Sequence, residues 1–393
     1  MGDAVIVSTA RTAIGSAFKG SLIDQDPYDL AAKAVGEAVR RSGIDPALID
    51  DLVLAESRQG GGDIARHAAV AAGLEHVPGL ANNRHCAAGL AAVTTAAGSI
   101  RAGMDNVVIA GGVESASTSP RFKRRILGAD DWDDWSPPSH PSTPDAPNED
   151  MTITVGWNAA VEANVTREEM DAWAFRSHQR AIAAIDAGAF VDEIFPIEVT
   201  GRDGVTRTFE VDEHPRRNSS LEKLASLKPL HPEIEGFSIT AGNASGVNDG
   251  AAAMVIADSA VAEAAGLEPL AVVRAWASAG VAPARTGLAP TVAIPKALER
   301  AGLGIGDIDL WELNEAFASM CVGTTRILGI DEGIVNVSGS GCSLGHPIAM
   351  TGARMLISLT HELRRRGGGT AVAAMCAGGG MSTAVVIDVP EPR

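Results

Sequence analysis

Gly339-Ser-Gly-Cys-Ser-Leu-Gly-His346 opens a helical run that is followed by Ala371-Val-Ala-Ala-Met-Cys-Ala-Gly-Gly-Gly380. A similar series stands far upstream, where Asn82-Asn-Arg-His-Cys86 opens an Ala-rich helical run before Val107-Val-Ile-Ala-Gly-Gly112. In both, a polar or Gly-rich turn precedes a helix, a hydrophobic strand and a glycine cluster. Such an internal repeat predicts two halves of similar topology. If the halves face each other, the helix starts and the glycine turns meet, and one active site is expected at their junction.

Outward from this repeat, short β-rich runs alternate with Ala-rich helical runs. Ala4–Ser8, Asp51–Ala55 and Val107–Ala110 are brief, β-branched and bounded by turn residues, as buried strands are. Leu30–Ser42 has apolar residues at helical spacing and ends at Gly43. This alternation predicts an α/β fold with a mainly parallel sheet covered by helices.

Residues 118–150 interrupt the alternation. They hold a basic run (Arg121, Lys123, Arg124, Arg125), an acidic cluster (Asp130, Asp131, Asp133, Asp134) and five prolines between Pro137 and Pro147. Because proline and dense charge disfavour regular structure, we predict an irregular excursion outside the α/β core, with the charges on a solvated loop.

Composition limits the classes of function. The 393 residues are 46% hydrophobic and 21% charged, with a net charge of −17. The length suggests two or three domains. The acidic balance argues against a nucleic-acid or polybasic membrane-surface partner. A small anionic ligand stays possible, but it requires a local cationic pocket.

The sequence predicts a cytoplasmic protein without a membrane span. Met1 leads directly into an apolar strand, with no basic leader. The longest apolar stretch, Ala87 to Ile100, is shorter than the roughly 18–20 residues that a span requires. The four cysteines are widely spaced and are interpreted as reduced thiols.

Two residues at predicted helix starts could carry chemistry. Cys86 stands where a strand ends and a helix begins, and the helix N-terminus is expected to favour its thiolate. The alternative is a buried structural cysteine. His346 lies before Pro347, which suits the first position of a helix. A histidine there could act as a base toward a thiol or simply cap the helix.

Two further features stand at strand ends. Cys376 enters Ala377-Gly-Gly-Gly380, whose N–H groups could converge on an oxyanion or could form an ordinary turn. Asn314 and Glu315 follow the apolar run Leu310-Trp-Glu-Leu313. An amide at this position could orient a water or stabilise an oxyanion.

Together these fragments resemble the signature blocks of the thiolases, the acyl-CoA:acetyl-CoA C-acyltransferases. The resemblance covers essentially the whole chain and starts at residues 7–15. Its blocks are residues 83–89 (NRHCAAG), 240–250 (TAGNASGVNDG), 314–317 (NEAF), 345–347 (GHP) and 376–380 (CAGGG).

The resemblance implies the thiolase fold, in which two similar βαβαβαββ halves carry an inserted loop domain. The N-terminal half would comprise residues 1–117 and 247–268. The insertion, which binds coenzyme A, would comprise residues 118–246. The C-terminal half would comprise residues 269–393.

The resemblance also implies catalytic roles. Cys86 would be the nucleophile that carries the acyl group, and His346 would activate it. Cys376 would be the acid or base for the acetyl-CoA enolate. One oxyanion hole would consist of His346 and a water held by Asn314, the other of the backbone N–H groups of Cys86 and Gly378.

Ligands and assembly follow from the same resemblance. Arg216 and Ser245 fall at coenzyme A-contacting positions, and Met151 and Phe317 fall near the pantetheine and acyl end. Coenzyme A and acyl-CoA would be substrates, with no permanently bound cofactor and no metal. A homodimer or homotetramer is expected. Thr286, where short-chain biosynthetic members usually have Met, leaves the acyl substrate open.

Three alternatives are weighed against thiolase activity. A ketoacyl synthase-like condensing enzyme would carry histidine in place of Cys376. A catalytically silent thiolase-like protein that binds acyl-CoA would have no reason to keep Cys86, Asn314, His346 and Cys376 together. A thiolate and imidazole metal site lacks the usual ligand spacing.

Overall fold

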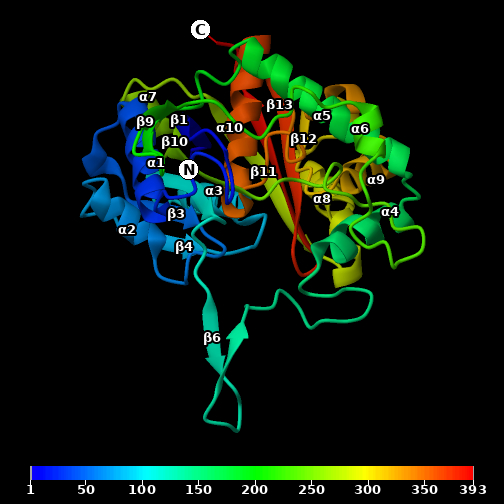
Figure 1. Cartoon of the computed structure of the whole chain (residues 1–393). Helices are drawn as coiled ribbons and strands as arrows, with labels where there is room; N and C mark the ends of the chain where they lie inside the picture. The colour runs from blue at the N-terminus through cyan, green and yellow to red at the C-terminus, as the bar shows by residue number, and fades with distance from the viewer. Residues whose placement is uncertain (1, 393) are drawn as a thin grey trace.

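Both halves of the chain contribute to one mixed sheet in the computed structural model, which describes residues 2–392 (Figure 1). The strand order is β12-β13-β14-β11-β1-β10-β5-β3-β4, and β2 pairs with β10. The ten strands are β1 (Ala4–Arg11), β2 (Gly15–Ser16), β3 (Asp51–Ala55), β4 (Leu80–Asn82), β5 (Val107–Ser115), β10 (Asn248–Asp258), β11 (Ala271–Gly280), β12 (Leu310–Leu313), β13 (Gly369–Ala377) and β14 (Met381–Val389).

The two halves of this sheet repeat each other. In the order β12-β13-β14-β11 the first pair is parallel and the next two are antiparallel, and the order β3-β5-β10-β1 has the same pattern. The halves join where β1 and β11 pair antiparallel, with Val5 opposite Val272 and Ile6 opposite Ala271. The repeat that the sequence predicts is therefore confirmed in the strand pairing.

The helices complete the repeat. In the first half the elements run β1, α1, β3, α2, β4, α3, β5 and β10, which is the βαβαβαββ series. In the second half the third strand is reduced to an isolated bridge between Trp311 and Val335. The α-helices of the two halves are α1 (Pro27–Ser42), α2 (Ile64–Ala71), α3 (Ala88–Arg101), α7 (Ser259–Ala264), α8 (Pro290–Ala301), α9 (Ala318–Leu328) and α10 (Ile348–Arg366), and the 3₁₀ turns are Pro46–Leu48, Pro283–Leu288, Ile305–Asp307 and Glu332–Ile334.

The prediction of a mainly parallel sheet is wrong. Parallel pairing is limited to β3 with β4 and β5, and to β12 with β13. The last two strands of each half are antiparallel neighbours, β5 with β10 and β13 with β14. In the second half the glycine turn after Ala377 reverses the chain directly, with Gly379 and Gly380 at φ values of 84° and 78°. A short turn of this kind can join only antiparallel strands.

Local sequence explains where two of the helices begin and end. The Asp26 side chain accepts a hydrogen bond from the Tyr28 N–H at the start of α1, and Gly43 ends this helix in a left-handed conformation. The helix predicted over 30–42 is thus confirmed and is extended by one turn. Pro347 is the cap of α10 and precedes its first residue, one position earlier than expected.

Helices α3 and α10 pack closely against each other and touch strands of both halves. Glycines permit this approach. A Cβ placed on Gly352 would lie 2.4 Å from the backbone nitrogen of Leu90, and one on Gly89 would lie 2.7 Å from the carbonyl oxygen of Ala349. Both contacts lie in the first turns, so the N-termini of α3 and α10 adjoin at the junction between the halves.

The segment between β5 and β10 lies outside the repeat. A two-stranded hairpin projects from the body of the molecule (Figure 1). The prediction that residues 118–150 form no regular structure is therefore wrong in part, because facing strands pair Lys123 with Asp134 and Arg124 with Asp133. The elements of the segment are β6 (Phe122–Arg125), β7 (Trp132–Trp135), a π-helix (Thr152–Trp157), α4 (Asn158–Glu162), α5 (Arg167–Asp186), β8 (Ile197–Thr200), β9 (Thr206–Phe209) and α6 (Leu221–Ala225).

Within residues 2–392, every helix is too short or too polar to cross a membrane.

The glycine contact between α3 and α10 yields a stability prediction. We expect Gly352→Ala to lower the free energy of unfolding by about 1–3 kcal/mol, because its methyl group would meet the backbone of α3. The matched control is Gly36→Ala in α1, where an added Cβ has nothing within 4 Å. It should be neutral or stabilising by up to about 1 kcal/mol. Urea unfolding measures both, and equal stability of the two variants would contradict the packing.

Candidate active site

Cys86 lies in the turn between β4 and α3. His85, which precedes it, has a φ of 46°, an uncommon value for a residue other than glycine. The Asn83 side chain holds this turn by accepting a hydrogen bond from the His85 N–H at 2.8 Å. The turn leaves Cys86 partly exposed just before Ala87, which caps α3.

The Cys86 sulfur faces the glycine turn of the other half. The Gly378 N–H donates a hydrogen bond to this sulfur, and it opposes the effect of burial, which raises the pKa of the Cys86 thiol to about 11. Nearby Glu114 also raises this pKa. Backbone N–H groups lower the pKa of this thiol, as expected at a helix start, but burial outweighs them and the thiol of the resting protein stays protonated.

His346 lies in the loop before α10 and is buried. Burial, together with the nearby Arg354 charge, lowers the pKa of His346 to about 3. Its backbone N–H donates to Asn248 Oδ1 at 3.0 Å, and its Nδ1 lies 2.7 Å from the Thr351 hydroxyl. The first contact holds the backbone and the second orients the ring. The lowered pKa keeps the imidazole neutral at neutral pH, so one ring nitrogen is unprotonated.

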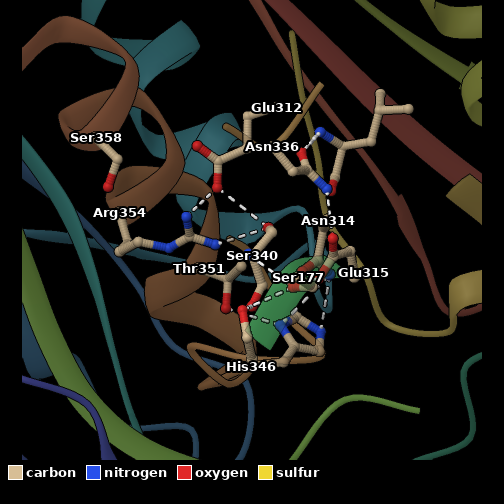
Figure 2. Close-up of polar contacts among 12 residues, drawn as sticks. Ser177, Glu312, Asn314, Glu315, Asn336, Ser340, His346, Thr351, Arg354 and Ser358 are labelled. Atoms are coloured by element: carbon tan, nitrogen blue, oxygen red, sulfur yellow. Dashed lines mark hydrogen bonds and ion pairs between the residues drawn. The ribbon is translucent and has the colours of Figure 1, made fainter. Parts of the chain in front are cut away.

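Asn314 follows β12 and faces this imidazole (Figure 2). Its Nδ2 lies 3.4 Å from His346 Nε2. Its buried Oδ1 has no hydrogen-bond partner among residues 2–392. The Asn314 N–H donates to the Ala374 carbonyl at 3.1 Å, so Asn314 and Cys376 stand at the same ends of neighbouring parallel strands.

Cys376 lies near the end of β13, buried against the Met320 sulfur at 3.6 Å. Burial raises the pKa of the Cys376 thiol, and the neighbouring Cys86 raises it further. Cys376 is thus a protonated thiol close to Cys86. Cys86, His346, Asn314, Cys376 and Gly378, all selected from the sequence, gather at the junction of the two halves.

Arg216 lines a cavity of about 340 Å³ beside the inserted segment. The cavity reaches Cys342, in the loop that carries His346, and His178, His214 and Lys223 share its lining. Burial lowers the pKa of both histidines to about 4, so they are uncharged at neutral pH. The positive charge of the cavity therefore comes from Arg216 and Lys223.

The other three predicted ligand contacts lie together at a different place. The residue before Ser245 forms a bridge with Phe317, and the Ser245 N–H donates to the Ala316 carbonyl at 2.9 Å. Met151 precedes the π-helix and packs with Phe317 in one apolar cluster. These residues do not line the Arg216 cavity.

The basic run at 121–125 lies on the projecting hairpin. There it faces the acidic cluster, with Lys123 3.9 Å from Asp134 and Arg125 3.9 Å from Asp130. Much of its charge is balanced locally, and the run does not line the cavity.

Sequence reasoning missed three residues that contact the site. Thr351 and Asn248 orient His346, and Lys223 supplies charge to the cavity. Asn248 lies inside block 240–250, one of the blocks that resemble the thiolases, so the resemblance could have indicated it. Lys223 and Thr351 lie in ordinary helical sequence, which offered none.

Comparisons with known proteins give matches along almost the whole chain. The model of the thiolase N-terminal domain matches residues 4–260, and that of the thiolase C-terminal domain matches residues 267–389. An acetyl-CoA acetyltransferase of Escherichia coli is 40% identical, with 99% of each chain covered. A beta-ketoadipyl-CoA thiolase of Pseudomonas aeruginosa is 42% identical, covering 98% of this chain and 99% of the relative. The crystal structure of human mitochondrial 3-ketoacyl-CoA thiolase superposes with a TM-score of 0.89 at 35% identity, covering 99% of each chain.

Fold and relatives together define an acyltransferase. The chain belongs to the thiolase family. The relatives favour neither the ketoacyl synthase-like nor the catalytically silent alternative.

Proposed function

We propose that this protein cleaves a 3-ketoacyl-CoA with coenzyme A, or runs the reverse condensation, through an acyl group carried on Cys86. The observation that carries this proposal is the place of Cys86. It directly precedes α3 where that helix adjoins the start of α10, and its sulfur accepts a hydrogen bond from the Gly378 N–H. A thiol with a neutral imidazole, a second thiol and backbone donors around it has the groups that two-step acyl transfer needs.

In the first step, His346 takes the Cys86 proton and the sulfur attacks the ketone carbon of the substrate. The bond between that carbon and its neighbour on the thioester side then breaks. The departing enolate of acetyl-CoA takes a proton from Cys376, and the acyl group stays on Cys86 as a thioester. The raised pKa of Cys376 suits this role, because a protonated thiol is available beside the enolate.

In the second step, Cys376 takes the proton of the incoming coenzyme A thiol. The coenzyme A sulfur attacks the thioester, and Cys86 leaves and recovers its proton from His346. Acyl-CoA is released and both cysteines return to their starting state. Protons and the acyl group move only between side chains and coenzyme A, so the proposal includes no permanently bound cofactor and no metal.

Two sets of donors would stabilise the oxyanions. The N–H groups of Cys86 and Gly378 would donate to the oxygen on the carbon that is bonded to the Cys86 sulfur. His346 and a water held by Asn314 would donate to the enolate oxygen. The unpartnered Asn314 Oδ1 leaves an acceptor for an ordered water. Loss of one such donor typically costs about 3–4 kcal/mol of transition-state stabilisation.

The coenzyme A phosphates would bind at the Arg216 cavity, since Arg216 and Lys223 supply local positive charge on an acidic protein. Ser245, Met151 and Phe317 would contact the pantetheine and acyl end. We also propose that the protein acts in the cytoplasm, where four free cysteines stay reduced.

An acyl-enzyme test examines the nucleophile. After incubation with acetyl-CoA, intact mass spectrometry should show one added acetyl group, because Cys86 forms the thioester. Cys86→Ala should show none. Cys321→Ala, a change at a buried cysteine that contacts the Asn314 carbonyl oxygen but has no part in the proposed chemistry, should keep the adduct. An acetyl adduct that persists without Cys86 would reject the assignment.

A second test examines the phosphate site. Arg216→Ala should raise the KM for coenzyme A about 10-fold with little change in kcat, because a charge-assisted contact is typically worth 1.5 kcal/mol or more. Lys223→Ala should act in the same direction. The control is Lys123→Ala on the hairpin, which should leave KM unchanged; an equal rise there would move the phosphate site to the hairpin.

We further propose that the protein is a homodimer or homotetramer. The edge strand β4 ends the sheet, and its Leu80 is 46% exposed. Open strand edges with apolar side chains are suited to pairing between copies. Light scattering should give the mass of two or four chains, and the mass of a single chain would contradict the proposal.

A further inference from the structure

Glu315, the residue after Asn314, is fully buried and has no role in the reaction described above. Its Oε1 accepts hydrogen bonds from Trp173 Nε1 at 2.9 Å and from Asn336 Nδ2 at 2.8 Å. Its Oε2 accepts from the Ser177 hydroxyl at 2.6 Å and from the Cys342 N–H at 3.0 Å. The carboxylate therefore joins helix α5, the Asn336 turn and the loop before α10 (Figure 2).

The loop that ends at His346 rests directly on this residue and its neighbour. The Cys342 thiol lies 3.6 Å from the Glu315 carbonyl oxygen. A Cβ placed on Gly341 would lie 2.7 Å from that oxygen and 2.9 Å from Asn314 Oδ1. The Ser343 hydroxyl lies 2.7 Å from the Ser177 hydroxyl, which itself binds Glu315. The path of the loop is thus set by contact with the Asn314–Glu315 dipeptide.

The opposite side of the loop is held by a separate pair. The Ser340 hydroxyl donates to Glu312 at 3.1 Å, and Arg354 binds both Ser340 and Glu312. The Glu312 contact fixes the start of the loop, and the Glu315 contact fixes its middle. Only the Glu315 contact also adjoins Asn314.

We propose that Glu315 is a positioning residue that sets the distance between Asn314 and His346 by hydrogen-bonding the Cys342 N–H. The inference rests on the proposed roles of Asn314 and His346 in stabilising the enolate. Through Trp173 and Ser177 of α5, the same carboxylate ties the inserted segment to this geometry.

The atoms around Glu315 predict the effect of an isosteric amide. In Glu315→Gln one oxygen becomes an NH₂ donor. If that NH₂ replaced Oε1, it would face two other donors, those of Trp173 and Asn336. The Asn336 amide is not free to flip, because its oxygen accepts a hydrogen bond from the Leu313 N–H. The NH₂ therefore faces Ser177, whose hydroxyl can accept, and the Cys342 N–H is left opposite a donor. The loop must then move away from Asn314.

The test combines thiolysis kinetics with a double-mutant cycle. Glu315→Gln should lower kcat by about 100-fold, as a displacement of about 1 Å does, with a smaller change in the KM for coenzyme A. If Glu315 acts on the Asn314–His346 pair, the double variant Asn314→Ala/Glu315→Gln should lose less kcat than the product of the two single losses. Glu193→Gln, at a buried carboxylate whose hydrogen-bond partners are Arg11 and Ser358 and not loop residues, should keep the parental kcat.

The outcomes separate this proposal from the proposed function. Suppose the parent protein is active. If the kcat of Glu315→Gln lies within about two-fold of the parental kcat, or if the two losses multiply in the double variant, the role of Glu315 is overturned while the proposed function stands. A parent without thiolysis activity overturns the proposed function. Should Glu315→Gln fail to fold by circular dichroism, Ser177→Ala and Trp173→Phe replace it. Each removes one donor from the same carboxylate, and each should lower kcat by a smaller factor in the Asn314→Ala background than in the parent.

Discussion

The close approach of α3 and α10 is the constraint on which the rest of the molecule depends. Gly89 and Gly352 let backbone meet backbone at the first turns of these helices. A larger residue at either position would separate the helix starts and, with them, Cys86 and His346. Each half of the repeat supplies one helix start, and the C-terminal half also supplies the glycine turn of Gly378. The site therefore belongs to neither half alone.

Burial at this junction decides the charge state of the groups that react. It raises the pKa of the Cys86 thiol and lowers that of His346, so the resting pair is neutral rather than a thiolate and an imidazolium. A neutral pair costs little to desolvate, whereas a separated ion pair would need compensating charge. The fixed donors around the pair then act only as charge develops, which is where preorganised groups contribute most to rate.

Much of the site could be predicted from the sequence because its residues stand at strand ends and helix starts. Cys86, His346 and Cys376 are marked by glycine, proline and the change from apolar to polar sequence. The antiparallel pairing of β10 with β5 and of β14 with β13 was not predicted, since the alternation of strands and helices along the chain does not reveal strand direction. The fourfold contact of Glu315 was also beyond prediction, because its donors come from α5 and from turns more than twenty residues away.

The central claim is that the junction of the two halves forms one acyl-transfer site. A crystal structure of the protein reacted with acetyl-CoA tests it most directly. The account predicts an acetyl group on Cys86 Sγ, with its carbonyl oxygen within hydrogen-bond distance of the Gly378 N–H and with Asn314 and His346 on the opposite side. An acetyl group on another residue, or a carbonyl oxygen turned away from Gly378, would contradict it.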